Sequence, residues 1–324
     1  MLILLLISAV AFDFLNGFHD SSNIVATVIS SRAMKPKVAL YLTALMNFIA
    51  PFIFGVAVAE AVGKNVIDSS SINVTVVIAA TLSAVIWNIL TWYLGIPSSS
   101  SHALVGGLLG AAILAQGPGV VKLNGLLMIL IALLISPPLG FLIGNLLMRF
   151  VRFTFKNVSP RINNTFKRLQ IFTSLGLALA HGSNDAQKTM GIITLGLISY
   201  GYQSTFHVPL WVIALSAGSF ALGTASGGWR LIRTLGGRIY KIRPADAFTS
   251  QAASAAVILG AAILGGPVST THVISSAIMG AGAADRVNKV RWQIGLDMLI
   301  TWGLTIPATA AVSALIHFLL VQFY

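Results

Sequence analysis

Ten apolar runs, separated by short charged or turn-forming stretches, occupy most of this 324-residue chain. About 20 consecutive apolar residues are enough for a helix to cross a bilayer. The runs are Leu2–Ile29, Val38–Ala59, Asn73–Leu94, His102–Ala115, Leu123–Met148, Leu169–Ile198, Pro209–Ser226, Ala247–Leu264, His272–Ala283 and Gln293–Val321. They predict an all-α, multi-pass membrane protein with about 10–12 membrane segments, some of them interrupted.

The composition narrows the class of protein further. Only 9% of the residues are charged and 56% are hydrophobic, whereas an ordinary soluble domain has roughly 25% charged residues. This excludes a soluble enzyme, a disordered chain and a nucleic-acid binder, even though the net charge is +12. The chain has no cysteine, which excludes disulfides and thiolate metal sites.

The basic residues predict how the chain is oriented in the plasma membrane. Lys and Arg cluster in four stretches, 32–37, 149–168, 230–243 and 286–291, and the positive-inside rule places all four in the cytoplasm. The loops Glu60–Ser71 and Tyr200–His207 carry almost no positive charge, so we expect both outside. Following the crossings from loop to loop puts both termini on the extracytoplasmic side and gives the first half an odd number of crossings.

Two pairs of motifs indicate an internal repeat. Residues 16–23 (NGFHDSSN) match residues 181–188 (HGSNDAQK), and residues 97–102 (PSSSSH) match residues 267–272 (PVSTTH), in the same order and 165–170 residues apart. With an odd number of crossings per half, the repeats must be inverted, as in many secondary transporters. We therefore expect a first transmembrane repeat at 1–148, a basic cytoplasmic linker at 149–168, and a second, inverted repeat at 169–324.

The first motif pair places a carboxylate deep in an apolar segment of each half, Asp20 and Asp185. A carboxylate at that depth is costly unless it is paired or hydrated, and we expect the helices to break at 16–20 and 181–185. Asn23, Asn184 and Gln187 add neutral oxygens, which together with carboxylates suit an alkali cation. The alternative is a structural role, with each carboxylate bonded to nearby backbone amides.

The second motif pair is typical of re-entrant hairpin tips that lead into a helix. A helix N-terminus binds oxyanions through its unpaired N–H groups and partial positive charge, and the hydroxyls of Ser100, Ser101, Thr270 and Thr271 would complete a cradle for a tetrahedral anion. The alternative is that these residues are ordinary helix caps. His102 and His272 are candidates for gating or proton transfer. Lys188, at the position of Asn23 in the second copy, either offsets the charge of the anion or extends to an interface.

These motifs resemble the duplicated G-x-N-D signature and the second repeated element of the PiT family of inorganic phosphate transporters, and the resemblance covers nearly the whole chain. It implies alternating access around a midplane site. Phosphate would contact Ser100, Ser101, Thr270, Thr271, Gln187, Asp20 and Asp185, and sodium would contact Asp20, Asn23, Asn184 and Asp185. His19 stands where many relatives carry Asn, and members with Gly-Phe-His-Asp include proton-coupled transporters, so the coupling ion stays open.

Charge also favours a symporter. A dianionic phosphate beside two ionised carboxylates carries a formal charge of about −4, and each helix N-terminus offsets only about half a charge, so bound cations are needed. A carboxylate acceptor also favours hydrogen phosphate over sulfate, because sulfate has no proton to donate.

The sequence therefore predicts a sodium-coupled importer of inorganic phosphate in the lipid bilayer. We expect no enzymatic activity, no resident cofactor and no nucleic-acid partner, with a homo-oligomer left open. Proton-coupled phosphate or sulfate transport and an anion channel are the alternatives. A hydrolase is disfavoured because Ser101–His102 and Thr271–His272 are sequential neighbours, a poor geometry for a nucleophile and its base.

Overall fold

The computed structural model describes residues 1–65 and 73–323, and within this part of the chain every regular element is a helix. The helices are α1 (Leu2–Ser30), α2 (Pro36–Phe54), α3 (Ala57–Asn65), α4 (Val74–Leu94), α5 (Ser100–Gln116), α6 (Leu123–Thr154), α7 (Ile162–Ser199), α8 (Leu210–Ser226), α9 (Trp229–Arg233), α10 (Pro244–Ile263), α11 (Thr270–Asp285) and α12 (Trp292–Phe323), with short turns η2 (Pro118–Val120), η3 (Thr234–Arg238) and η4 (Val287–Lys289).

Six of these helices are long and apolar enough to cross a membrane, namely α1, α2, α4, α6, α10 and α12. Helix α8 and the segment Trp229–Arg238, bent by 59°, form a seventh span if they are taken together. The expected all-α membrane fold is confirmed. The other segments expected from the sequence correspond to α5 and α11, which are short, and to α7, which carries the polar residues 181–188.

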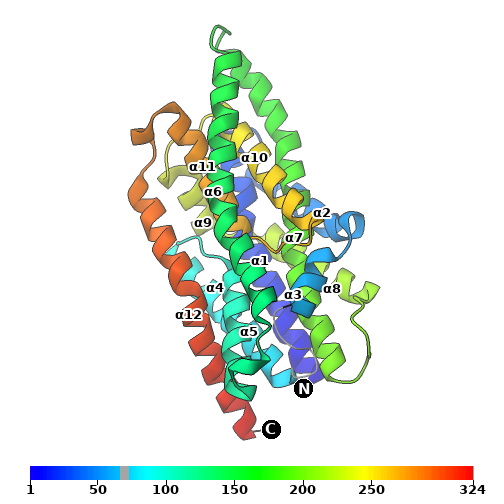
Figure 1. Ribbon diagram of the computed structural model, residues 1–324. Helices are drawn as coiled ribbons and strands as arrows, with labels where there is room; N and C mark the ends of the chain where they lie inside the picture. Colours follow the sequence, from blue (N-terminus) through cyan, green and yellow to red (C-terminus); the bar gives the residue numbers. More distant parts are fainter. Residues whose placement is uncertain (66–72, 324) are drawn as a thin grey trace.

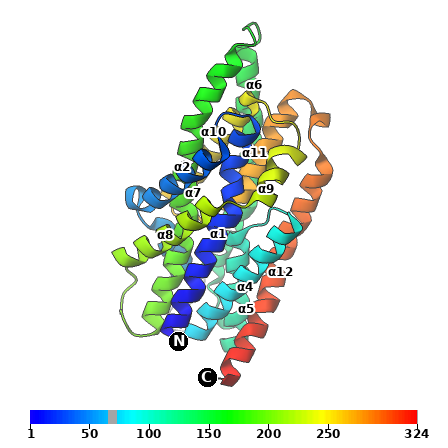
Figure 2. The same ribbon diagram turned by 180° about the vertical axis from the view of Figure 1, so that it is seen from behind.

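The helices of the two halves run in opposite directions. Figure 1 shows both termini at one end of the molecule and the connection between α6 and α7 at the other, so α1 and α7 are antiparallel, as are α6 and α12. The reverse view in Figure 2 agrees. The hairpin helix of each half also packs against the last helix of the other half, α5 on α12 and α11 on α6. This arrangement is consistent with inverted repeats.

The connection between the halves is shorter than the stretch 149–168. Helix α6 continues to Thr154 and α7 begins at Ile162, so only residues 155–161 lie between them. Of the loop expected at Glu60–Ser71, residues 60–65 belong to α3 and the rest lie outside the described residues.

The prediction that helices break at 16–20 and 181–185 is wrong, because α1 and α7 continue through both motifs. Polar side chains in these segments are buried in protein rather than exposed to lipid, so the backbone need not unwind to satisfy them. The hydroxyls of Ser21, Ser22 and Ser183 each donate to a carbonyl three residues earlier in their own helix. The helices are interrupted elsewhere, at Gly55 and Gly227, both with positive φ.

Two glycines of the repeated motif allow close contact between helices. A Cβ added to Gly17 of α1 would lie 2.0 Å from the carbonyl oxygen of Phe220 on α8. A Cβ added to Gly182 of α7 would lie 2.6 Å from the carbonyl oxygen of Asn47 on α2. The absence of a side chain at these positions therefore brings α1 against α8 and α7 against α2, in the same way in both halves.

The two hairpins are built alike. Helices α4 and α10 are followed by glycines at matching positions, Gly95 and Gly265, with φ of 71° and 70°, a conformation that favours glycine. Helices α5 and α11 then begin after N-cap serines: Ser99 Oγ accepts from the backbone N–H of His102 at 3.2 Å, and Ser269 Oγ accepts from that of His272 at 3.3 Å. The N-termini of both hairpin helices are buried inside the bundle.

Candidate functional site

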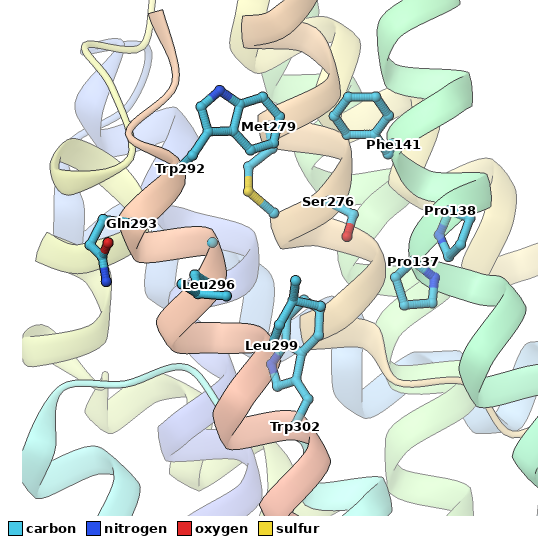
Figure 3. Close-up of a pocket in the computed structure, with 11 residues that line it drawn as sticks. Pro137, Pro138, Phe141, Ser276, Met279, Trp292, Gln293, Leu296, Leu299 and Trp302 are labelled. Carbon is cyan, nitrogen blue, oxygen red and sulfur yellow. The ribbon is translucent and has the colours of Figure 1, made fainter. Parts of the chain in front are cut away.

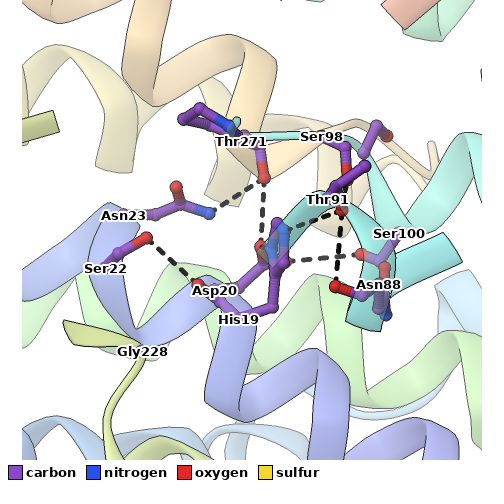
Figure 4. Close-up of polar contacts among 12 residues, drawn as sticks. His19, Asp20, Ser22, Asn23, Asn88, Thr91, Ser98, Ser100, Gly228 and Thr271 are labelled. Carbon is purple, nitrogen blue, oxygen red and sulfur yellow. Dashed lines mark hydrogen bonds and ion pairs between the residues drawn. The ribbon is translucent and has the colours of Figure 1, made fainter. Parts of the chain in front are cut away.

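Asp20 of α1 lies at the N-termini of both hairpin helices (Figure 4). Thr271 donates to its Oδ1 at 3.1 Å, and Ser100 donates to its Oδ2 at 3.3 Å. His19 Nδ1 lies 2.9 Å from Oδ1. The carboxylate is fully buried, so the first turns of α5 and α11 and its own neighbour supply the hydrogen bonds that water would otherwise provide.

Asp185 of α7 occupies the matching position in the second half. Thr270 donates to its Oδ2 at 2.7 Å, and His181 Nε2 lies 3.1 Å from the same oxygen. The ammonium of Lys188, one turn along α7, pairs with Oδ1. Asp185 is also fully buried, but unlike Asp20 it has a lysine side chain paired with it.

The hydrogen bonds follow the internal repeat. In each half the acid accepts from the first hydroxyl of its own hairpin helix, as described above. The bonds between halves also correspond: Asn23 Nδ2 donates to Thr271 Oγ1 at 2.9 Å, and Lys188 Nζ donates to Ser101 Oγ at 2.5 Å. The residues at equivalent positions thus make equivalent contacts, with a neutral amide in one half and an ammonium in the other.

The two acids meet at one histidine. His181 Nε2 lies 4.0 Å from Asp20 Oδ2 and 3.1 Å from Asp185 Oδ2. Asp20, His181 and Asp185 can thus each direct one ligand atom to a common point, with these three atoms within 4.8 Å of one another. Carboxylate and hydroxyl oxygens are the ligands that hard cations take. The imidazole nitrogen is also suited to bind or release a proton. This cluster can therefore hold a cation or a shared proton.

Two of the expected site residues point elsewhere. The side-chain oxygen of Gln187 accepts from the backbone N–H groups of Val58 and Ala59, and its nitrogen donates to Gly55 and Ser183. Gln187 therefore caps the start of α3 rather than reaching the acids.

Asn184 braces the second hairpin. Its Nδ2 donates to the carbonyl of Gly266 at 3.1 Å, and its Oδ1 accepts from the N–H of Val268 at 3.4 Å. The structure brings Asp20, Asp185, Asn23, Lys188 and the four predicted hydroxyl residues together, but it does not bring Gln187 or Asn184 to them.

His272 stacks on Trp302 beside the hairpin tips, and His102 lies against His272. The two imidazole centroids are 4.6 Å apart, and those of His272 and Trp302 are 3.7 Å apart. Trp302 Nε1 also donates to the carbonyl of Pro97 at 3.2 Å. From the sequence, Trp302 is a packing or interfacial residue. Its position against His272 is set by α12 of the second half, which sequence spacing does not reveal.

Trp302 also borders an apolar cavity of about 560 Å³ between α6, α11 and α12 (Figure 3). Pro137, Met279 and Leu299 are among the residues lining it, and no charged side chain does. An inorganic anion would find no cation or donor cluster there, so this cavity is not the polar site.

Sequence reasoning gave no definite role to three residues that contact the acids or their neighbours. His19 and His181 lie one and four positions before Asp20 and Asp185, a spacing that places His181 on the same helix face as its acid. Thr91 near the end of α4 lies 3.4 Å from His19 Nε2 and 2.8 Å from the hydroxyl of Ser98. Nothing in the sequence around Thr91 singles it out.

The fold and the site together define a class of protein: a polytopic helical membrane transporter in which two antiparallel halves meet at a buried polar centre. Comparison with known proteins gives the family. Residues 16–313 match the phosphate transporter family, and the chain belongs to this family of transporters, which are not enzymes.

Relatives extend over nearly the whole chain. Probable low-affinity inorganic phosphate transporters of Bacillus subtilis (strain 168) and Rhizobium meliloti (strain 1021) are each 44% identical over 98% of this chain and 96% of their own length. A solved structure described as the sodium-dependent phosphate transporter superimposes with a TM-score of 0.90, covering 100% of this chain and 99% of its own, at 24% identity. That structural likeness supports the fold.

Proposed function

We propose that this protein imports inorganic phosphate by cation symport, with alternating access around the Asp20–Asp185 centre. The observation that carries the proposal is the convergence of two buried acids with hydroxyls from the first turns of two capped helices. The names of the bacterial relatives support phosphate as the substrate.

The hairpin N-termini are the proposed anion site. Both α5 and α11 begin inside the bundle, and their N-cap serines bond to the third helical N–H of each helix, which leaves earlier N–H groups for a ligand. The partial positive charge of a helix N-terminus and nearby hydroxyl donors favour an oxyanion. The acids favour hydrogen phosphate over sulfate, since only hydrogen phosphate can donate to a carboxylate.

Sodium is the proposed coupling ion, and Asp20 is its principal ligand. A dianion between two carboxylates has a formal charge of about −4, and the lysine and two helix ends leave about two negative charges uncompensated. The oxygens of Asp20, Ser100 and Thr271 form a hard-ligand group on the side that lacks a lysine. At Asp185 the ammonium of Lys188 already lies against the carboxylate, so we infer that it serves there as a fixed cation.

Proton coupling is the second candidate, and the histidines favour it. His19 lies 2.9 Å from Asp20 and His181 lies 3.1 Å from Asp185, both buried. A proton shared between an imidazole and a carboxylate would reduce the negative charge of the site as a sodium ion would. Uptake by this route depends on pH rather than on sodium.

Equilibrium phosphate binding to the purified protein tests the coupling ion. Phosphate should bind more tightly in sodium than in choline at equal ionic strength, and linkage requires phosphate to tighten sodium binding by the same factor. Asp20→Asn should reduce the sodium effect, and Asp185→Asn should reduce it less. Asp297→Asn, an exposed carboxylate on α12, is the control.

Equal phosphate binding in sodium and choline would overturn sodium coupling, and a pH-dependent affinity in its place would support protons. Competition by sulfate at similar concentration would contradict selectivity for phosphate. Radiolabelled phosphate entering proteoliposomes without any dependence on a cation gradient would indicate a channel.

A further inference from the structure

A second group of buried polar side chains lies between the central acids and the N-terminal end of α1. It consists of Asp13 and Asn16 on α1, Thr189 on α7 and Ser216 on α8, all 0% exposed. Both carboxylate oxygens of Asp13, both amide atoms of Asn16 and both hydroxyls lack a hydrogen-bond partner among the described residues. The central site does not use any of these four side chains.

Helix geometry brings the four side chains together. Asp13, Asn16 and Asp20 are spaced by three and four residues, so they follow one face of α1, and Asp13 lies two turns, roughly 10 Å, from Asp20. Thr189 is one turn beyond Asp185 on the antiparallel α7. The hydroxyls of Thr189 and Ser216 lie beside the Asp13 carboxylate.

Buried polar side chains without hydrogen-bond partners, as in this group, indicate that a ligand binds among them. Buried polar atoms in proteins are nearly always hydrogen-bonded, and an isolated carboxylate in the membrane interior is costly. A proton would satisfy one oxygen of Asp13 and leave the amide of Asn16 unpaired. A cation coordinated by several oxygens would satisfy the carboxylate, the Asn16 carbonyl and both hydroxyls at once.

We propose that Asp13, Asn16, Thr189 and Ser216 form a sodium site separate from the Asp20–Asp185 centre. A single carboxylate with neutral oxygens matches the charge of a monovalent hard cation, whereas Ca²⁺ takes roughly 6–8 oxygen ligands. Ligands from α1, α7 and α8 mean that the bound ion joins both halves of the molecule. Its role in coupling rests on the proposed symport, but sodium binding at this site does not require phosphate.

Binding of radioactive ²²Na⁺ to the purified full-length protein without phosphate tests the proposal. In an Asp20→Asn background, which removes the central sodium ligand, sodium binding should persist. Adding Asp13→Asn should weaken it at least about 10-fold, the loss expected for one charge-assisted contact. Adding Asp297→Asn instead should leave it unchanged. Asp13→Asn alone should keep phosphate affinity at saturating sodium.

A milder pair of variants protects the test against misfolding. Ser216→Ala and Thr189→Val keep the carboxylate and should each weaken sodium binding, with size-exclusion profiles like that of the parent. Equal sodium binding with and without Asp13 overturns the proposal and leaves a water-filled polar pocket. A pH-dependent uptake that Asp13→Asn shifts, without any sodium binding, also overturns it in favour of a proton site. An unchanged sodium dependence of phosphate binding in Asp20→Asn contradicts the central coupling site and not this one.

Discussion

The Lys188 ammonium donates a hydrogen bond to the Ser101 hydroxyl at 2.5 Å, and this bond joins α7 of the second half to α5 of the first. The equivalent bond in the other half runs from the neutral amide of Asn23 to Thr271. An otherwise symmetric site is therefore electrically asymmetric, with a fixed positive charge at Asp185 and none at Asp20.

Replacing Lys188 by Asn should make the two halves of the site alike and remove the fixed cation. Phosphate affinity at low sodium should fall about 10-fold or more, because a unit charge near a dianion in a low-dielectric site is worth at least 1.4 kcal/mol. High sodium should restore part of it. Phosphate uptake measured over a range of sodium concentrations checks this, with the exposed Lys241→Asn as control. An unchanged sodium dependence would show that Lys188 has only a structural role.

The hydroxyls that bridge the halves should contribute directly to anion affinity. Removing those of Ser101 and Thr271 by alanine substitution should weaken phosphate binding by roughly 10- to 150-fold each, since a hydrogen bond to a charged group is worth about 1.5–3 kcal/mol. Ser226→Ala is a suitable control, because that exposed hydroxyl bonds only within its own helix. Unchanged phosphate affinity in the double variant would mean that Ser101 and Thr271 only stabilise the N-termini of α5 and α11.

Gly17 should be intolerant of even a methyl group. An added Cβ would collide with the Phe220 backbone at 2.0 Å, and backbone cannot move aside as a flexible side chain can. Gly17→Ala should therefore cost about 1–3 kcal/mol, as overpacking does, and lower the thermal unfolding temperature. Gly176→Ala is the matched control: it also lies in a helix, has open space around it, and should be neutral or stabilising. Equal unfolding temperatures for the two variants would contradict the close contact of α1 and α8.

The sequence predicted the parts of the site that depend on local chemistry. Ser99 and Ser269 cap their helices as the Ser/Thr-rich motifs indicate, and the symmetric placement of Asp20 and Asp185 was evident from the repeat. Helix breaks at these acids were predicted wrongly. A polar segment in an apolar run does not require unwound backbone, because burial against other helices satisfies its side chains without unwinding.

The sequence does not indicate which neighbouring helix each side chain contacts. Gln187 lies only two positions from Asp185, yet its side chain turns to the start of α3. The bend at Gly55, just before α3, leaves the N–H groups of the first turn of α3 beside Gln187. Trp302 reaches His272 only because α12 packs across the other half. Such contacts join residues far apart in sequence, and no local pattern indicates them.

The orientation of the chain in the membrane is the last prediction. The basic residues Arg152 and Arg238 should be cytoplasmic, and Tyr202 in the connection between α7 and α8 should be external, because positive loops stay inside. All three side chains are exposed. The natural chain has no cysteine, so single cysteines at these positions can be labelled in intact cells by a thiol reagent that does not cross membranes. Position 202 should react readily, while 152 and 238 should react only after the membrane is permeabilised.

Labelling at 152 but not at 202 in intact cells would reverse the orientation and place both termini in the cytoplasm. Labelling of 152 together with 202 would contradict the crossing of α7 and, with it, the antiparallel arrangement of the two halves across the bilayer.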